Sequence, residues 1–304
     1  MSDSYDARSL KHEHDMLAVY RRESARDAGL LQPLSNACLR AAAFEWALSR
    51  DPETVRRLWA EAARALARGF SRKRKGFDPS PDQFILAIEL SIATREADAF
   101  TTLARFAPGV RSTALQGAQA FRGGRGHFQL AESYALIAGA ILERRRQPAS
   151  AAIQSLAAAT EESGGGWWEE RFPDPSEAAW LMAEHSGICE LLKIIVESTS
   201  DKYSPSSADP GTRIAQSRAD LVERFGSAMD QVLTHLKWFV ESDADHHPKL
   251  YVWLPGIAIS ALAAAAGLPM AWMQRRHEEH APEYSRLPLE LIFKPDPMLE
   301  RPSM

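Results

Sequence analysis

An alanine-rich helical hairpin over residues 35–70 is the feature that most constrains how this chain can fold. Ser35 or Asn36 can cap its first helix. The run Asp51-Pro52-Glu53 ends that helix and begins the next, with aspartate as the N-cap and proline at the first helical position. Two helices joined by so short a turn pack antiparallel, and the small alanine side chains let their axes approach closely.

The same construction returns twice along the chain. Residues 81–108 form an apolar segment, a turn near Glu96 and a second helical segment, and residues 128–162 repeat the pattern with a break at Pro148. The breaks fall at unequal intervals, so we expect a loose series of hairpins rather than a strict repeat array. Two longer helices follow over 175–199 and 212–242.

These patterns predict an all-α fold, an irregular array of antiparallel helical hairpins with α-solenoid or tetratricopeptide-like packing. Valine, isoleucine and threonine never alternate with polar residues, and only the YVWL segment (251–254) and the LELIF segment (289–293) suggest extended backbone. We expect a single helical domain over 1–304, with a subdivision into a hairpin half (1–163) and a long-helix half (164–304).

Residues 250–273 carry no charge and are long enough to span a bilayer. Pro255 and Pro269 interrupt the run, and its centre is alanine, which contributes little insertion energy. We therefore predict a buried core helix over 250–268 and no membrane association. The polar start of the chain shows no export signal, and Cys38 and Cys189 lie far apart in apolar helical patterns. Both indicate a cytoplasmic protein with reduced, buried thiols.

The charge balance and the motifs argue against several functions. The formal charge of −4 disfavours a nucleic-acid binder with a broad basic face. His277 and His280 are three residues apart, whereas a metalloprotease helix needs histidines at i and i+4. No G-x-S-x-G elbow and no glycine-rich phosphate loop follows a strand. We predict no enzyme activity, no cofactor and no metal site.

The loop over 161–177 is the most unusual segment for binding. Two adjacent tryptophans follow three glycines, and six carboxylates surround a single Arg171. Aromatic anchors ringed by one sign of charge are typical of protein–protein hot spots. The alternative is that the loop is held against the core. The predicted partner-binding residues are Glu161, Glu162, Trp167, Trp168, Glu169, Glu170, Asp174 and Glu177.

The hairpin AAAFEWALSRDPETVRRLWAEAARALARGF resembles the repeated unit of bacterial polymorphic-toxin immunity proteins, in particular the immunity protein 49 family. The closing stretch LPGIAISALAAAAGLPMAWM, followed by APEYSRLPLELI, is similar to the same family. The likeness spans most of 35–293, and the 161–211 region departs from it. The resemblance implies a helical protein that binds and neutralises a toxin, often a nuclease, from a contact-dependent or type VI secretion system.

A mildly acidic helical scaffold suits an inhibitor of a basic enzyme, because acidic side chains can occupy the enzyme's phosphate path and steer rapid association. The expected function is therefore that of an immunity protein with a cognate protein toxin as its partner. The alternative is a helical-repeat scaffold or adaptor that binds a partner peptide in its concave face. An undetected enzyme, for example a metal-dependent one, is the third interpretation.

Overall fold

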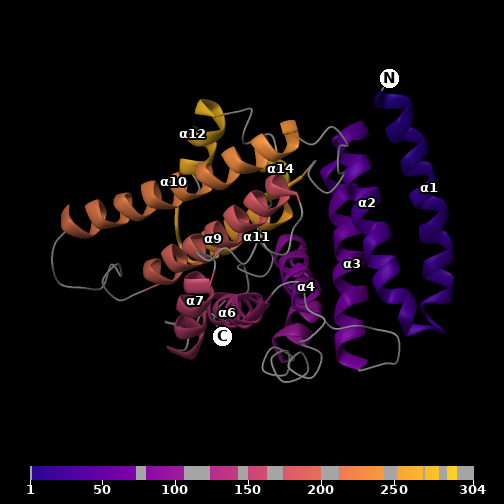
Figure 1. Ribbon diagram of the computed structural model, residues 1–304, viewed down its shortest axis with the longest axis horizontal. Coiled ribbons are helices and arrows are strands. Elements are labelled where there is room, and N and C mark those ends of the chain that lie inside the picture. Colours follow the sequence, from indigo (N-terminus) through magenta and orange to yellow (C-terminus); the bar gives the residue numbers. More distant parts are fainter. Residues whose placement is uncertain are drawn as a thin grey trace, which may run out of the picture. The chain divides into compact units, whose positions relative to one another are not determined.

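The structure, a computed structural model, describes nine stretches of the chain: residues 2–72, 80–105, 124–142, 150–162, 174–199, 212–242, 252–269, 271–280 and 286–292. Every regular element in these stretches is helical (Figure 1). The predicted all-α fold is thereby confirmed.

The elements follow one another along the chain and are joined by turns or by segments outside the described residues. They are α1 (Ser2–Glu23), η1 (Ala28–Leu30), α2 (Leu31–Ser49), α3 (Pro52–Arg72), α4 (Pro81–Thr94), α6 (Gly124–Leu142), α7 (Ser150–Glu162), α9 (Pro175–Ser198), α10 (Thr212–Ser242), α11 (Leu254–Ala265), α12 (Ala271–Glu279) and α14 (Leu289–Ile292). A further helical segment covers 97–105.

Contacts divide the chain into two compact units. The first unit contains Met1–Ala118, His246–Ala258 and Arg286–Met304, and the second contains Gln119–Asp245 and Ile259–Ser285. The boundary after residue 163 that the sequence suggested falls inside the second unit. Helix α11 contributes 254–258 to the first unit and 259–265 to the second.

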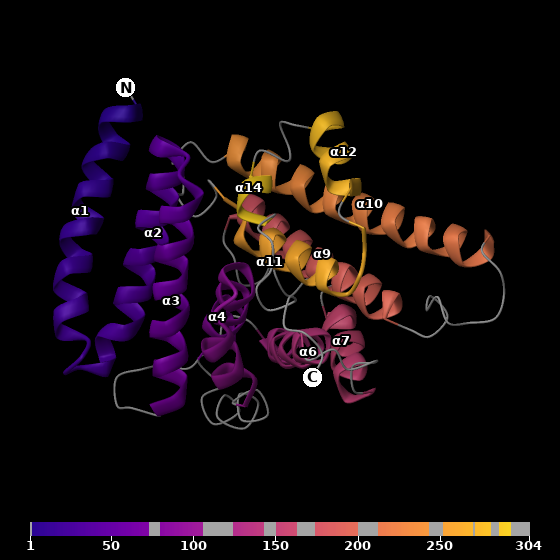
Figure 2. The same cartoon turned by 180° about the vertical axis from the view of Figure 1, so that it is seen from behind.

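The first unit is a succession of antiparallel helices in which α1 packs on α2, α2 on α3 and α3 on α4 (Figures 1 and 2). Its core is rich in alanine between α2 and α3, as the small side chains of the hairpin predict. Phe70 of α3 and Phe84 of α4 meet edge to face with their ring centroids 5.4 Å apart. The short α14 packs against α3, so the last described segment returns to the first hairpin.

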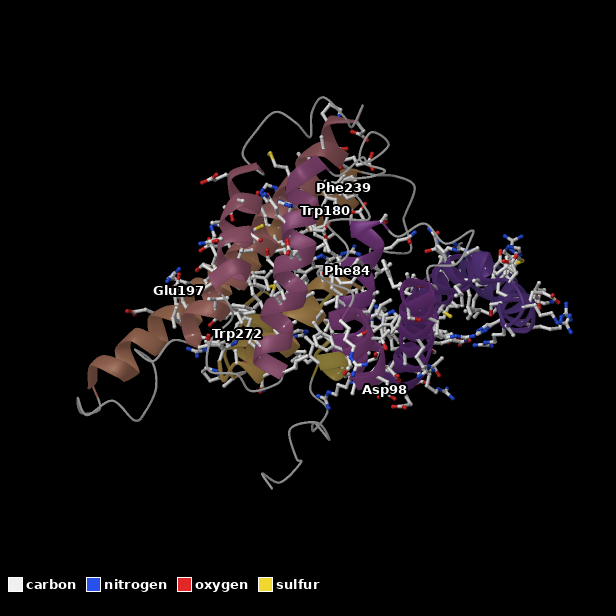
Figure 3. All side chains as sticks on the ribbon, turned by 90° about the horizontal axis from the view of Figure 1, so that it is seen from below. Phe84, Asp98, Trp180, Glu197, Phe239 and Trp272 are labelled. Carbon is white, nitrogen blue, oxygen red and sulfur yellow. The ribbon has the colours of Figure 1, made fainter. Side chains whose placement is uncertain are left out.

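The second unit is organised around the long pair α9 and α10. Trp180 of α9 stacks on Phe239 of α10 with their ring centroids 6.2 Å apart, and the two rings lie side by side in Figure 3. Helix α7 packs against both α6 and α9, and α12 packs on α10 through a T-shaped contact between Trp272 and Phe225. These aromatic pairs each add stabilisation beyond their buried area.

Local sequence signals set several of the helix ends. Asp51 accepts a hydrogen bond from the backbone N–H of Glu53 at 3.0 Å and from the Thr54 hydroxyl at 2.6 Å, so it caps α3 as predicted. Ser80 caps α4 by accepting from the Gln83 N–H. The two hairpin turns use Arg50 and Arg95 in the left-handed region, with φ of 54° and 60°, where glycine is the usual residue.

Three of our sequence-based expectations differ from the structure. Helix α2 begins at Leu31, so Ser35 and Asn36 lie within it and do not cap its start. The LELIF segment is helical over Leu289–Ile292 rather than extended, because a short apolar run has no periodicity that separates a strand from a buried helix. The N-terminal segment, to which the sequence patterns assign no element, forms the 22-residue helix α1. Among its described side chains, Leu17 has no exposed surface, and charged residues flank it in the sequence.

The apolar segment after residue 250 forms helix α11 over Leu254–Ala265. Ile257, Ile259 and Leu262 are fully buried, and Gly267, which lies two residues beyond the end of the helix, adopts a φ of 86°. Within the described residues, no helix is both long enough and apolar enough to cross a membrane.

Candidate binding surface

A charged groove lies in the first unit. Its volume is about 580 Å³, and it lies along the polar face of α3. Helix α1 contributes His14 and Arg21, and the end of α4 contributes Thr94, with Glu96 just beyond. A groove of this size lies within the range of protein ligand sites.

The floor of the groove follows from the strong amphipathicity of α3. Its charged residues recur at three- and four-residue spacing, which places them on one face of the helix. The opposite face carries Val55, Trp59 and Leu66, which are buried against neighbouring helices. The charged face consists of Glu53, Arg56, Arg57, Glu61 and Arg64.

Two bridges to neighbouring segments fix the walls of the groove. Arg21 of α1 donates two parallel hydrogen bonds to Glu61, at 2.7 and 2.6 Å, and these bonds raise the pKa of the guanidinium. Arg64 donates to Glu96 at 2.6 Å. The bidentate geometry of the Arg21–Glu61 pair restricts both of its side chains to few rotamers.

Arg56 and Arg57 differ from these pairs, because their hydrogen bonds go to uncharged acceptors. Arg56 donates to the backbone carbonyl of Glu290 on α14, and Arg57 donates to the Thr54 hydroxyl at 2.8 Å. Partial burial lowers the pKa of Arg56; Glu53 opposes this shift and the positive charge of Arg95 adds to it. Among the described residues, neither Arg56 nor Arg57 is hydrogen-bonded to a carboxylate, although Glu53 and Asp51 interact with them electrostatically.

Beneath the groove, Cys38 of α2 lies in the core and is close enough to Glu61 for the two to interact. Burial, followed by the negative charge of Glu61, raises the pKa of the Cys38 thiol to about 12. Cys189 of α9 is likewise buried, with its pKa raised to about 12 by burial. Both thiols are free, and neither has the thiolate character that a reactive cysteine needs.

The acidic loop predicted as a partner-binding surface lies largely beyond what the structure describes. Trp167, Trp168, Glu169 and Glu170 are outside the described residues, and of Glu162 only the helical backbone at the end of α7 is described. Glu161 is exposed on the last turn of α7.

The last two carboxylates of that loop have a local structural explanation. Asp174 caps α9 by accepting hydrogen bonds from the N–H and the hydroxyl of Ser176, at 2.8 and 2.7 Å, and these bonds lower the pKa of its carboxyl. Glu177 lies exposed in the first turn of α9, where a negative charge is favoured by the helix dipole. A structural role is thus sufficient for Asp174 and Glu177.

The histidines considered for metal binding lie at the end of α12. His277 and His280 are half-buried, and Glu278 and Glu279 between them are exposed. Among the described residues no group of three or more histidine, cysteine, aspartate or glutamate side chains could hold a metal ion.

The fold and the groove define an all-α protein built from antiparallel helical hairpins. Comparisons with protein-family models, with curated proteins and with solved structures find no match to this chain. The resemblance to the immunity protein 49 family therefore stays a prediction.

Sequence reasoning did not find the groove. The Arg21–Glu61 and Arg64–Glu96 pairs join residues that are 40 and 32 positions apart, and their proximity depends on how α1, α3 and α4 pack. The available signal was the charged face of α3, on which Arg56, Arg57 and Arg64 share one side at helical spacing.

Proposed function

We propose that this protein acts by binding another protein, and that its partner is a toxin that it neutralises by direct contact. The observation that carries the proposal is the groove of the first unit, in which a bidentate Arg21–Glu61 pair and a single hydrogen bond from Arg64 to Glu96 order charged side chains along α3. Charges that are already ordered lose little conformational entropy when a partner binds, so they favour specific recognition.

The assignment of the partner as a toxin rests on the sequence. The first hairpin and the closing segment resemble the immunity protein 49 family, and the loop over 161–177 combines two tryptophans with an excess of carboxylates. An acidic surface with aromatic anchors suits a basic enzyme such as a nuclease.

Co-expression tests this function directly. A toxin encoded next to this protein should kill host cells when it is expressed alone and should be harmless when the protein is present. The double variant Trp167→Ala, Trp168→Ala should protect poorly while remaining folded, because truncating a true anchor costs about 2 kcal/mol or more of binding.

The control removes a tryptophan elsewhere. Trp238 on α10 is 49% exposed, so Trp238→Ala deletes an exposed indole outside the loop. This variant should protect as well as the wild type. If the loop variant also protects fully, the loop is not the contact surface, and if no neighbouring toxin is neutralised, the toxin assignment is wrong.

The second candidate function is that of a scaffold or adaptor that binds a partner peptide. The groove favours it, because a charged hollow along one helix of a hairpin array is where such proteins hold a peptide. Recovery of a non-toxin partner by affinity capture from the native host, abolished by substitutions in the groove, would support this function over toxin neutralisation.

A further inference from the structure

The chemistry of the groove indicates what kind of partner segment it can hold. Of its four arginines, Arg21 and Arg64 are neutralised by carboxylates of the protein itself, at 2.6 Å in each case. Arg56 and Arg57 are adjacent in sequence, and their hydrogen bonds go to a carbonyl and a hydroxyl. Glu53 acts electrostatically on Arg56 and Asp51 on Arg57, but among the described residues neither guanidinium is hydrogen-bonded to a carboxylate. These two guanidiniums are therefore the part of the groove with hydrogen-bond donors left for an anionic ligand.

The surroundings of Arg56 disfavour its positive charge, as the lowered pKa of the guanidinium indicates. The side chain is partly buried beside α14, and the positive charge of Arg95 acts on it, while Glu53 provides only partial compensation. Removing a cation from water beside another cation costs free energy that a bound anion would recover. The planar guanidinium is also the side chain best suited to hold a carboxylate through two parallel hydrogen bonds.

The three glutamates of the groove restrict where a ligand can carry negative charge. Glu53, Glu61 and Glu96 are interleaved with the arginines, so a continuous polyanion laid along α3 would meet repulsion at each of them. A nucleic acid places a negative charge at every nucleotide and is disfavoured for this reason. A protein segment can place one or two carboxylates opposite Arg56 and Arg57 and neutral or basic residues opposite the glutamates.

We propose that the groove binds a short acidic segment of the partner protein, whose carboxylates are held by Arg56 and Arg57. This inference rests on one part of the proposed function, namely that the molecule acts by binding a partner protein. The apolar atoms of Leu58 and Ala60, which also line the groove, provide contact area beneath the segment. A hollow of about 580 Å³ has room for a few side chains, so the recognised segment is short.

The test uses a fluorescein-labelled peptide of four glutamates flanked by alanines, titrated with the full-length protein and followed by fluorescence anisotropy. Saturable binding is expected at low salt, and it should weaken as the salt concentration rises. The Arg56→Gln, Arg57→Gln variant should bind at least about tenfold more weakly, because each charge-assisted carboxylate contact contributes about this much or more.

A control variant makes the same change in net charge elsewhere on the first unit. Arg22 pairs with its neighbour Glu23 and lies outside the groove, and Arg26 follows in the turn after α1. The variant Arg22→Gln, Arg26→Gln should bind the peptide within about twofold of the wild type. Equal losses in both variants would show that net charge alone attracts the peptide, and would overturn the proposal.

Arg56 also contacts α14, so its substitution can disturb the fold. Arg57→Gln avoids this problem, because the hydrogen bond that Arg57 makes among the described residues goes to the Thr54 hydroxyl of its own helix, and the cap residue Asp51 keeps its hydrogen bonds from Glu53 and Thr54. This single variant should unfold at the wild-type temperature and still bind the peptide several-fold more weakly. No binding by the wild type, or tighter binding of a single-stranded oligonucleotide with the same charge, would overturn the proposal.

The neutralisation assay separates this inference from the proposed function. If the wild type and the Arg57→Gln variant neutralise the toxin equally well, the groove proposal is wrong and the proposed function stands. If the wild type binds the acidic peptide through Arg57 but neutralises no toxin, the groove proposal stands and the toxin assignment is wrong.

Discussion

A methyl group added at Gly187 of α9 would lie 2.0 Å from Cγ2 of Val232 on α10. The two long helices of the second unit therefore approach each other so closely at this point that only glycine fits. Valine is stiff about its first side-chain torsion and cannot simply turn away. We expect Gly187→Ala to lower the free energy of unfolding by about 3 kcal/mol, measured by urea denaturation.

Two further variants test whether the close approach is the cause. Val232→Ala should itself destabilise by about 2 kcal/mol. In the double variant the added methyl would meet only Cβ of residue 232, at 3.4 Å, so the double variant should be more stable than the sum of the two single effects. Gly139 of α6 has nothing within 4 Å of such a methyl, and Gly139→Ala should stabilise by about 0.5 kcal/mol. Additive effects at residues 187 and 232 would contradict this explanation.

Arg276 of α12 links its helix to two carboxylates of α10. Its guanidinium lies 2.5 Å from Glu223 and 3.0 Å from Asp230, and only 17% of its side chain is exposed. Arg276→Ala should cost about 2 kcal/mol, because a half-buried carboxylate loses its partner and the stem of the arginine no longer covers α10.

The matched control is Arg224, which lies on α10. The Arg224 side chain is 48% exposed and pairs with Glu197 at 2.6 Å. Arg224→Ala should cost about 0.5 kcal/mol, since exposed ion pairs contribute little. Thermal unfolding of both variants, at low and at high salt, measures the difference. A loss at Arg276 no larger than that at Arg224 would show that α12 is not held in this way.

Ile259 of α11 has no exposed surface. Ile259→Asp should unfold the protein, because an unpaired buried carboxylate costs several kcal/mol, on the order of the whole stability of a domain. Ile259→Val, which removes one methyl, should cost about 1 kcal/mol and leave the circular dichroism spectrum unchanged. A folded Ile259→Asp protein would show that this side of α11 is open to water.

The two cysteines predict a pH dependence. Their pKa values are raised to about 12 in the folded chain, whereas a thiol in the unfolded chain titrates near 8.5. Above that pH the thiols of the unfolded chain lose protons that the folded chain keeps. The contribution of the two thiols to the free energy of unfolding is therefore fully retained below about pH 8.5 and falls as the pH rises towards 12.

Urea denaturation at pH 8 and at pH 10.5 checks this dependence. The wild type should lose more stability between the two values than the Cys38→Ala, Cys189→Ala variant does. At pH 8 neither thiol of the folded protein should react with a maleimide, and both should react in guanidinium chloride. Rapid labelling of the folded protein would contradict the burial of these side chains.

Several helix ends were predictable from the sequence because their causes are local, whereas α2 begins at Leu31, before the predicted caps Ser35 and Asn36. Asp51 with Pro52 marks the start of α3, and α10 has the bounds that its periodicity predicted. Helix α1 was missed because it depends on partners distant in sequence: Glu13, whose side chain is 8% exposed, accepts two hydrogen bonds from Arg40 of α2. A polar segment gives no sign of such a pairing.

The site was less predictable than the fold for the same reason. The acidic loop stands out in the sequence because its residues are adjacent, although Asp174 and Glu177 have a helix-capping and a helix-dipole role at the start of α9. The groove combines residues of α1, α3 and the segment after α4, none of which is unusual alone. Only their packing brings Arg21 to Glu61.

The first unit is assembled from three separate parts of the chain, and this affects the order in which it can form during synthesis. The N–H of Trp253 donates to the carbonyl of Arg286 at 2.8 Å, and Arg56 donates to the carbonyl of Glu290. While a ribosome is still translating the second unit, the helices of the first hairpins are already outside but lack these closing contacts. The first unit to be made is thus the last to be completed, and a chain shortened before residue 286 would leave α3 without the helix that covers it.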